Sequence, residues 1–206
     1  MKLLEALEEQ RWDDHRYYHQ SRINQSLHLI SAISFLTAYV YLAINPVVSA
    51  LLGWGVAMVS RQIGHFFFEP KDYDKVNRVT HSHKEDIKIG YNLQRKRILL
   101  AFWAMTPALA WMQPNLFGLI EARPGAGGYL YTLSLLWIGL AAIALVGRTV
   151  HLFFIRDVQT GVIWLIKILT DPLNDVRMYY RSPFHLMRGQ LIDPMDDISP
   201  DGSRRH

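Results

Sequence analysis

Four long apolar runs limit what this chain can fold into. They cover residues 27–44, residues 47–68, a stretch that starts at Ile98, and residues 129–155. An α-helix of about 20 apolar residues crosses the hydrocarbon core of a bilayer. Only Asn45 and Pro46 separate the first two runs, so these predict a tight helical hairpin. The sequence therefore predicts an all-α integral membrane bundle, with about four transmembrane helices and additional interfacial helices.

A soluble all-α protein is the alternative fold. Half of the 206 residues are hydrophobic, yet the mean hydropathy is only +0.04, because charged stretches alternate with the apolar runs. Helices that are apolar on every side are normally buried in lipid or in a large core. The apolar runs therefore favour the membrane fold, and the length fits a single membrane domain over residues 1–206.

The remaining segments predict shorter elements. Pro107 and Pro114 predict that the third run is kinked or has an interfacial far end. Residues 161–169 are too short to span, so we expect them at the interface or in a re-entrant segment. Beyond them, three residues have the spacing of a surface helix: Leu173, Val176 and Tyr180. The tail from Asp193 onward is expected to be poorly ordered.

Lysine and arginine are distributed according to topology. Residues 1–26 hold four of them, residues 69–97 hold eight and residues 156–206 hold seven, whereas the opposite-side connections hold only Arg123. Basic loops stay in the cytoplasm by the positive-inside rule. We therefore expect both termini and the loop 69–97 on the cytoplasmic side of the bundle 27–155. The membrane is then a bacterial inner membrane or the endoplasmic reticulum.

Composition excludes several classes of function. The chain has no cysteine, which excludes disulfides, thiolate catalysis and Cys-ligated metals. The pI of about 9.3 raises the question of nucleic acid, but the basic residues do not form one face, so we expect no nucleic-acid partner. The phosphate-binding and nucleophile motifs of soluble enzymes are missing from the sequence as well.

Seven of the nine histidines are predicted at one depth, near the cytoplasmic interface. They are His15, His19, His28, His65, His81, His83 and His151. Polar clusters at membrane depth are costly and mark functional sites. The alternative is that His15, His81 and His83 are solvated and that His151 extends toward the headgroups. His28 and His65 are harder to explain in that way, because both lie within apolar helices.

Helical spacing places possible partners beside these two histidines. Arg61, His65 and Glu69 are spaced by four and share a face, as do Asn24 and His28. A histidine that binds a metal usually donates its other N–H to a carboxylate or carbonyl. Three residues are candidates for this role: Glu69, Asn24 and Gln62. Imidazoles without thiolates suit iron, zinc or copper.

His19 and His28 meet only if the chain bends between them. They are nine residues apart, and on one continuous helix they would lie on opposite faces. We therefore predict a break between Gln20 and Asn24. A short pre-membrane helix would carry His15 and His19.

Two segments, "YYHQSRINQSLHLI" and "RQIGHFFFE", resemble the membrane-embedded 2-hydroxy fatty acid dioxygenases known from the fungal endoplasmic reticulum, which have bacterial relatives. The resemblance implies an Fe²⁺ enzyme that uses O₂ to cleave a 2-hydroxy fatty acid, leaving an acid one carbon shorter. It implies His19, His28 and His65 as iron ligands. The matching supporting positions are Tyr18, Asn24, Gln62, Gly64 and Glu69.

The expected chemistry is consistent with this resemblance. Three histidines leave open positions on Fe²⁺ for O₂ and for a chelating substrate. The substrate carboxylate is expected among the basic residues Arg61, Arg148, Lys84 and Lys88. Its alkyl tail is expected between helices, against Phe35, Trp54, Phe66, Phe67 and Phe68. The expected partners are thus a lipid-like acid, O₂ and the bilayer.

The sequence leaves the fourth ligand open among His15, His81, His83, His151 and Glu69. We predict His19, His28, His65 and His151 as metal ligands, and Arg61, Glu69, Tyr18, Asn24 and Gln62 as catalytic residues. Three other functions remain alternatives. They are a di-metal membrane hydroxylase or desaturase, a bis-histidine haem protein that pairs His28 or His65 with His151, and a non-catalytic membrane subunit.

Overall fold

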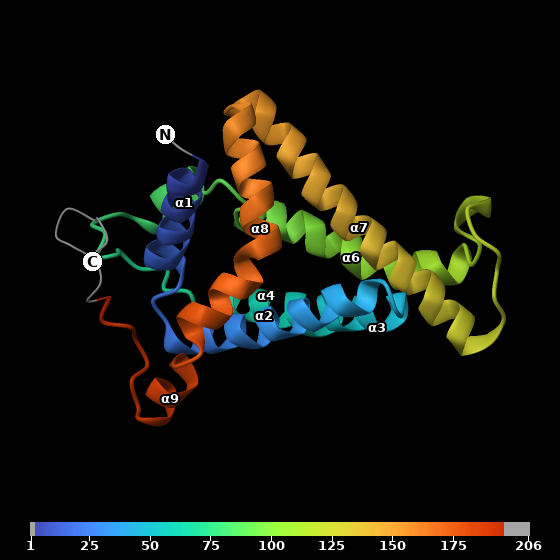
Figure 1. Ribbon diagram of the computed structural model, residues 1–206, viewed down its shortest axis with the longest axis horizontal. Helices are drawn as coiled ribbons and strands as arrows, with labels where there is room; N and C mark the ends of the chain where they lie inside the picture. Colours follow the sequence, from blue (N-terminus) through green and yellow to red (C-terminus); the bar gives the residue numbers. More distant parts are fainter. Residues whose placement is uncertain (1–2, 196–206) are drawn as a thin grey trace.

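The computed structural model describes residues 3–195, and this part of the chain is helical, with two isolated β-bridges and no strand (Figure 1). The α-helices are α1 (Leu3–Tyr18), α2 (Arg22–Leu42), α3 (Pro46–Ala50), α4 (Val59–Ile63), α5 (His81–Ile87), α6 (Leu93–Met112), α7 (Gly125–Ile155), α8 (Val158–Tyr179) and α9 (Ser182–Met187). The π-helical stretch η1 (Leu51–Met58) joins α3 to α4, and a second one, η2 (Gly64–Phe68), continues α4, so that all four form one helical run. A 3-10 turn, η3 (Leu116–Gly118), follows α6.

Three helical runs in the described part are long and apolar enough to cross a membrane. They are Arg22–Leu42, Pro46–Phe68 and Gly125–Ile155. The expected third run forms α6, which begins at Leu93 and does not have the same combination of length and hydropathy. The helix includes Pro107 but ends at Met112, because Gln113 precedes Pro114 and a residue before proline disfavours the helical conformation.

The predicted hairpin between the first two runs is present. Asn45 caps α3 by accepting hydrogen bonds from the backbone N–H groups of Val47 and Val48, at 3.0 and 3.3 Å. Pro46 occupies the first helical turn, where its missing N–H costs nothing. Ser49 Oγ then donates to the carbonyl of Ala38 at 2.8 Å, which ties the returning helix to α2.

Tryptophans hold the second run, α6 and α7 together. The buried Trp54 donates its Nε1–H to the carbonyl of Trp137 at 2.7 Å, and Trp137 donates to Thr106 Oγ1 at 2.8 Å. Trp103 of α6 stacks on Trp54 with ring centroids 6.2 Å apart. Buried indoles need a partner for the N–H group, so these bonds fix which faces of the three helices meet.

The C-terminal segment differs from the expectation. A short interfacial stretch and a separate surface helix were predicted, but α8 is one helix of 22 residues that continues through Pro172. It packs against α1, α2 and α7. The face with Leu173 and Tyr180 is exposed, as expected of a surface helix. The opposite face is buried and carries a series spaced by four: Lys167, Asp171, Asp175 and Tyr179.

The beginning of the tail is anchored, contrary to the expectation of disorder. Asp193 pairs with Arg22 Nη1 at 3.0 Å and accepts from Gln25 Nε2 at 2.7 Å. Ser21 and Ile192 form an isolated antiparallel bridge. The tail after Met195 lies outside the described residues.

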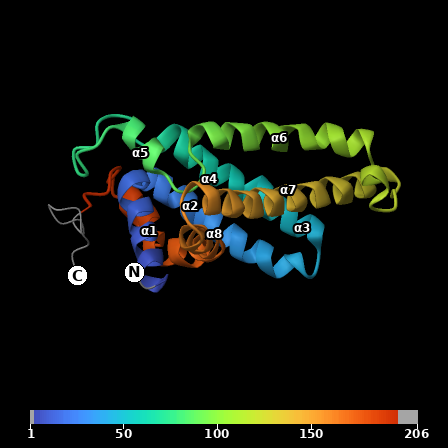
Figure 2. The ribbon, with the colours of Figure 1, turned by 90° about the horizontal axis from the view of Figure 1, so that it is seen from above.

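α2 and the second run lie side by side, α7 crosses them obliquely, and α8 descends steeply from the end of α7 to α2 (Figure 1). α1 lies across one end of this arrangement (Figure 2). This end contains the break between α1 and α2, the end of the second run and most of α8. It is the end where the histidines gather.

A close backbone approach between α7 and α8 generates a stability prediction. A Cβ added at Gly161 would lie 2.6 Å from the ring of Phe153 and 2.8 Å from the carbonyl oxygen of Thr149. We expect Gly161→Ala to destabilise the protein by about 1–3 kcal/mol through overpacking. Thermal unfolding of the purified protein in detergent measures this.

Gly147→Ala on α7 is the matched control, because a Cβ there meets nothing within 4 Å. It should leave the unfolding temperature unchanged or raise it slightly, since alanine favours helix over glycine. Equal effects of the two substitutions would contradict the tight α7–α8 contact.

Candidate metal centre

Three histidines from three separate segments of the chain lie close together. His19 follows α1, His28 lies on α2 and His65 lies on η2. One nitrogen from each ring lies within 4.8 Å of the others, and within residues 3–195 this is the one histidine or acid group spaced for a metal ion. The Nε2 atoms of His19 and His28 are 3.2 Å apart.

The predicted break brings His19 to His28. α1 ends at Tyr18 and α2 begins at Arg22, so the chain turns slightly earlier than the predicted interval between Gln20 and Asn24. Ser21 is extended, and its side chain caps α2 by accepting from the backbone N–H of Asn24. The two imidazole centroids are consequently 4.1 Å apart.

Two buried amides at the start of α2 hold this break. Gln25 Nε2 donates to the carbonyl of His19 at 2.7 Å. Asn24 Nδ2 donates to the carbonyl of Tyr18 at 2.9 Å. Asn24 was predicted beside the site, and its observed role is to fix the backbone before His19.

Gly64 allows the second run to approach α2 at this level. A Cβ at this position would lie 2.1 Å from Oδ1 of Asn24. Any side chain would therefore separate the two helices directly beside His65. His65 itself lies in a π-helical stretch, a distortion that is frequent at functional sites.

A carboxylate orients His65. Its Nδ1 is 2.7 Å from Oε2 of Glu69, four residues later, as the spacing predicted. An imidazole that donates from Nδ1 to a carboxylate keeps a lone pair on Nε2, which is the arrangement found behind metal-binding histidines. Burial raises the pKa of Glu69, while the nearby Lys88 and Lys96 act in the opposite direction.

A second carboxylate approaches His28 from α8. Oδ2 of Asp175 lies 3.6 Å from His28 Nδ1 and 3.3 Å from Nη2 of Arg61. The pairing explains where Arg61 goes: it neutralises a buried acid. The guanidinium of Arg61 is therefore not free to bind a substrate carboxylate, which is the role that the sequence analysis predicts for it.

The donor set fits a metal ion. His19 is 2% exposed, and burial together with the neighbouring His28 lowers its pKa well below 6.5, so the ring is neutral and able to ligate. Its Nδ1 has no hydrogen-bond partner among the described residues. Two nitrogens bound about 2.1 Å from one ion are about 3.0–3.4 Å apart at octahedral or tetrahedral angles. The observed 3.2 Å between His19 and His28 lies in this range.

Other predicted residues lie elsewhere. Tyr18 donates its hydroxyl to the carbonyl of Lys84 at 2.6 Å, and this bond fastens α5 to α1. Gln62 is turned toward Met58, with Nε2 3.1 Å from the sulfur. Neither side chain has a hydrogen bond to the three histidines, so the catalytic roles predicted for them have no support in the geometry.

His151 is not part of the cluster, which corrects its prediction as a ligand. It lies exposed on α7, and its Nδ1 is 3.0 Å from Nη1 of Arg148. Arg148 also donates to the carbonyl of Ile89. His151 is predicted at a depth similar to that of the three clustered histidines, but its side chain does not face them. Among the other candidates for a fourth ligand, His15 pairs with the hydroxyl of Tyr179 at 3.2 Å and Glu69 is engaged with His65.

Two residues of the site were missed by sequence reasoning. Asp175 backs His28, and Tyr179 places its ring 5.6 Å from that of His19 and 6.3 Å from that of His28. The signal was present as charged and polar residues at intervals of four within an otherwise apolar segment. The length of the apolar stretch predicts an interfacial segment, whereas the polar series spaced by four marks the buried face of a longer helix.

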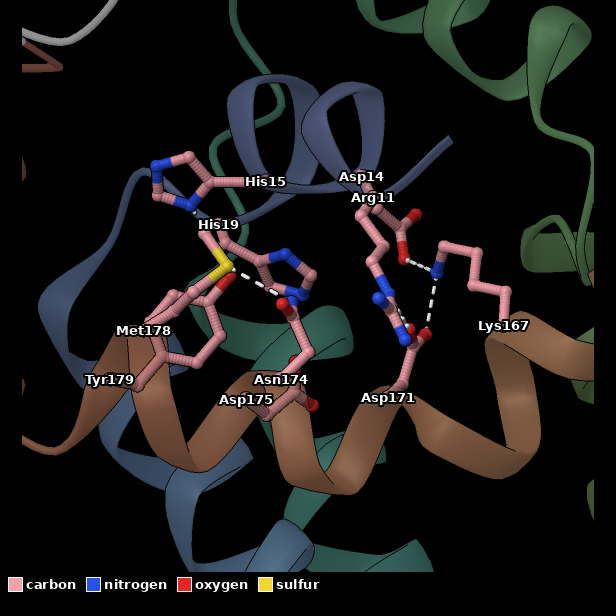
Figure 3. A pocket seen from close by; sticks show the side chains of 10 residues that line it. All are labelled: Arg11, Asp14, His15, His19, Lys167, Asp171, Asn174, Asp175, Met178 and Tyr179. Carbon is pink, nitrogen blue, oxygen red and sulfur yellow. Dashed lines mark hydrogen bonds and ion pairs between the residues drawn. The ribbon is translucent and has the colours of Figure 1, made fainter. Parts of the chain in front are cut away.

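An ion-pair network joins α8 to the helix that leads to His19 (Figure 3). Lys167 Nζ lies 2.7 Å from Oδ2 of Asp14 and 2.5 Å from Oδ2 of Asp171, and Arg11 lies 3.5 Å from the other oxygen of Asp171. Burial raises the pKa of Asp14, but Lys167 outweighs this and the net pKa lies well below the ordinary value. The network therefore holds α1, and with it His19, against α8.

Two small pockets flank the histidines. The first lies between α1 and α8 and includes His19 (Figure 3). The second lies beside His65, and its lining is His65, Glu69, Lys71, His81, Glu85, Lys88, Leu93 and Lys96.

The α1–α8 network generates a prediction for the metal centre. Lys167→Met leaves Asp14 and Asp171 without their shared cation, and breaking a buried pair in this way costs about 3–5 kcal/mol. We expect α1 to loosen and the affinity for a divalent metal to fall by about 10-fold or more, because His19 follows α1 directly. Metal titration and hydrogen exchange of α1 measure the two effects.

Arg177→Met is the control on the same helix, since Arg177 is exposed. It should change neither quantity. Full metal affinity in Lys167→Met, together with increased exchange in α1, would show that the docking of α1 does not position His19.

The chain has no match among protein-family models, curated proteins or solved structures. What it does must therefore be argued from the three histidines, the groups behind them and the pockets on either side.

Proposed function

We propose that this protein is a membrane-embedded oxygenase that binds Fe²⁺ through His19, His28 and His65. Its proposed substrate is a 2-hydroxy fatty acid, which it shortens by one carbon. The observation that carries the proposal is that three imidazoles from three separate segments, two of them buried, bring one nitrogen each within 4.8 Å of the others. Placing imidazoles together in a largely buried site is costly unless a ligand uses them.

The donor set suits a transition-metal ion, and iron is among the ions that it suits. Three neutral nitrogens without thiolates suit iron, zinc or copper, and three ligands leave open positions. Bound iron would supply O₂ activation and a place for the substrate hydroxyl and carboxylate to chelate. The protein's own contribution is orientation: Glu69 fixes His65, and Asp175 with Arg61 fixes the surroundings of His28.

The proposed reaction balances without a further reductant. A 2-hydroxy acid and O₂ give the shortened acid, CO₂ and water. The bond between the carboxyl carbon and the hydroxyl-bearing carbon breaks, and these two carbons supply all four electrons that O₂ accepts. The protein then has to exclude water and hold the acid, and it needs no electron-transfer partner.

The path of α6 supports the four-span topology predicted from the sequence. Its beginning lies near the histidine end, where Tyr18 fastens the preceding α5. Its far end meets the beginning of α7, where Thr132 Oγ1 donates to the carbonyl of Pro114 and Tyr129 donates to that of Pro107. We propose that α6 crosses the membrane as well, which leaves both termini and the metal centre on the cytoplasmic side.

Two alternative sites fit the described geometry less well. A di-metal enzyme needs a second group of ligands, and the described residues form one such group. A haem held by His28 and His65 needs a porphyrin between them, yet their ring centroids are 4.8 Å apart. His151, the other proposed haem ligand, is exposed on α7 and pairs with Arg148.

The test uses full-length protein purified without oxygen and supplied with Fe²⁺. We expect about one tightly bound iron per chain, and consumption of one O₂ per molecule of 2-hydroxypalmitate converted to pentadecanoate. His28→Ala and His65→Ala should each lower iron affinity and turnover by more than about 100-fold, since even supporting residues cost 10–100-fold. Elemental analysis, an oxygen electrode and mass spectrometry of the product measure these quantities.

His83→Ala is the control, because His83 is exposed on α5 and outside the cluster. It should retain iron and turnover. Two irons per chain would favour the di-metal alternative, and a Soret band would favour haem. Unchanged metal binding in both alanine variants would contradict the proposed centre and favour the alternative of a non-catalytic membrane subunit.

A further inference from the structure

The pocket beside His65 is built from three separate segments. The end of the second run contributes Glu69 and Lys71, α5 and its C-cap contribute Glu85 and Lys88, and the first turn of α6 contributes Lys96. These segments meet at the histidine end of the bundle. The pocket therefore lies next to the proposed iron but on the side away from α8.

The two pockets that flank the histidines differ in their balance of charge. The pocket at α8 is lined by Arg11 and Lys167 against three acids, Asp14, Asp171 and Asp175. The pocket at His65 is lined by three lysines, Lys71, Lys88 and Lys96, against two acids, Glu69 and Glu85. Arg61 pairs with Asp175, so the charges at the first pocket are balanced. The second pocket has one cation more than acids and attracts an anion.

The acids in the pocket at His65 are already engaged. Glu69 accepts from His65 at 2.7 Å. Glu85 accepts from the backbone N–H of Leu93 at 2.5 Å and lies 3.6 Å from Nζ of Lys88. The backbone N–H of Lys96 donates to the carbonyl of Asn92, but among the described residues its side-chain ammonium has no hydrogen bond or ion pair. A lysine on the wall of a pocket without a close counter-charge is a favourable position for an anion.

Three of the four basic residues that the sequence offered for the substrate carboxylate are used elsewhere. Arg61 pairs with Asp175, Arg148 donates to the carbonyl of Ile89, and Lys84 is buried against Asp74 at 2.7 Å. The fourth, Lys88, lines the pocket with its Nζ 3.5 Å from the ring centroid of Tyr18.

We propose that this pocket binds the carboxylate of the acid substrate, with Lys96 as its main counter-charge and Lys88 beside it. The inference rests on the proposed function, because it places the reacting end of the substrate next to His65. A carboxylate here would supply the negative charge that the lysines lack.

The surface beyond the pocket suits an alkyl tail. Past Lys96, α6 exposes Ile98 and Phe102, and the second run exposes Phe67 at 76%. These side chains belong to helices that we place in the membrane. A fatty acid anchored at Lys96 would therefore have its head in the pocket and its tail against apolar helix surfaces facing lipid.

The test measures binding to full-length protein kept free of metal, so that iron does not contribute. Octanoate and 1-octanol are the probes, because they share a tail and differ in charge. We expect Lys96→Met to weaken octanoate binding by about 10-fold and to leave 1-octanol binding unchanged. Lys96→Arg should retain most of the affinity for octanoate. Calorimetric titration measures both ligands.

Lys75→Met is the matched control. Lys75 is an exposed lysine between the second run and α5, and it lies outside the pocket. It should bind octanoate as the unmodified protein does. If Lys96→Met does not fold, Lys88→Met replaces it, with a smaller loss expected. Equal octanoate affinity in the lysine variants and the control would overturn the proposal.

Two further outcomes are informative. The first distinguishes a fatty acid from another oxyanion, and the second distinguishes this proposal from the proposed function. Displacement of octanoate by inorganic phosphate, but not by chloride at equal ionic strength, would assign the pocket to an oxyanion and overturn the fatty-acid assignment. Lysine-dependent octanoate binding in a protein that takes up no iron would support this pocket and remove the proposed oxygenase. Iron-dependent turnover with an unchanged KM in Lys96→Met would support the proposed oxygenase and overturn the proposal for this pocket.

Discussion

The turn between Tyr18 and Arg22 is the constraint on which the rest of the site depends. Without it, His19 and His28 would lie on opposite faces of one helix. With it, the chain folds back so that their Nε2 atoms are 3.2 Å apart. Asn24 and Gln25 hold the turn, and Gly64 lets the second run come close enough for His65 to join. A local backbone event thus decides whether distant histidines form a centre.

The polar contacts around the centre are better explained by specificity than by stability. Buried ion pairs such as Lys167 with Asp14 and Asp171 regain little more than their desolvation cost, but they strongly penalise any arrangement that leaves one partner unpaired. An apolar α1–α8 contact would tolerate sliding by a turn. The charged contact fixes one register and therefore one position for His19. Pairing of Asp175 with Arg61 acts in the same way at His28.

Patterns along the chain predicted what depends on local chemistry. The hairpin at Asn45, three apolar runs, the break before Asn24 and the Glu69–His65 pair all follow from spacing and capping. Facing direction was less accessible. His151 lies at a suitable depth but points away, because the rotation of α7 is set by tertiary packing such as the bond between Trp54 and Trp137. For the same reason the polar face of α8, with Asp175, became visible only when the helix was placed against α2.

The difference in charge balance between the two pockets makes the two sides of the centre unequal. A dication held by three neutral imidazoles keeps its whole charge, and of the two nearest acids Asp175 is already neutralised by Arg61. Only the carboxylate of Glu69 then offsets the dication, so a net positive charge would remain on the side of His65. Lys96 adds a further positive charge there. Charge balance at the completed site calls for an anionic ligand beside His65 and not at α8, where the acids are already paired with Lys167, Arg11 and Arg61. A bound carboxylate would thus complete the electrostatics of the centre and also determine the side from which a substrate approaches it.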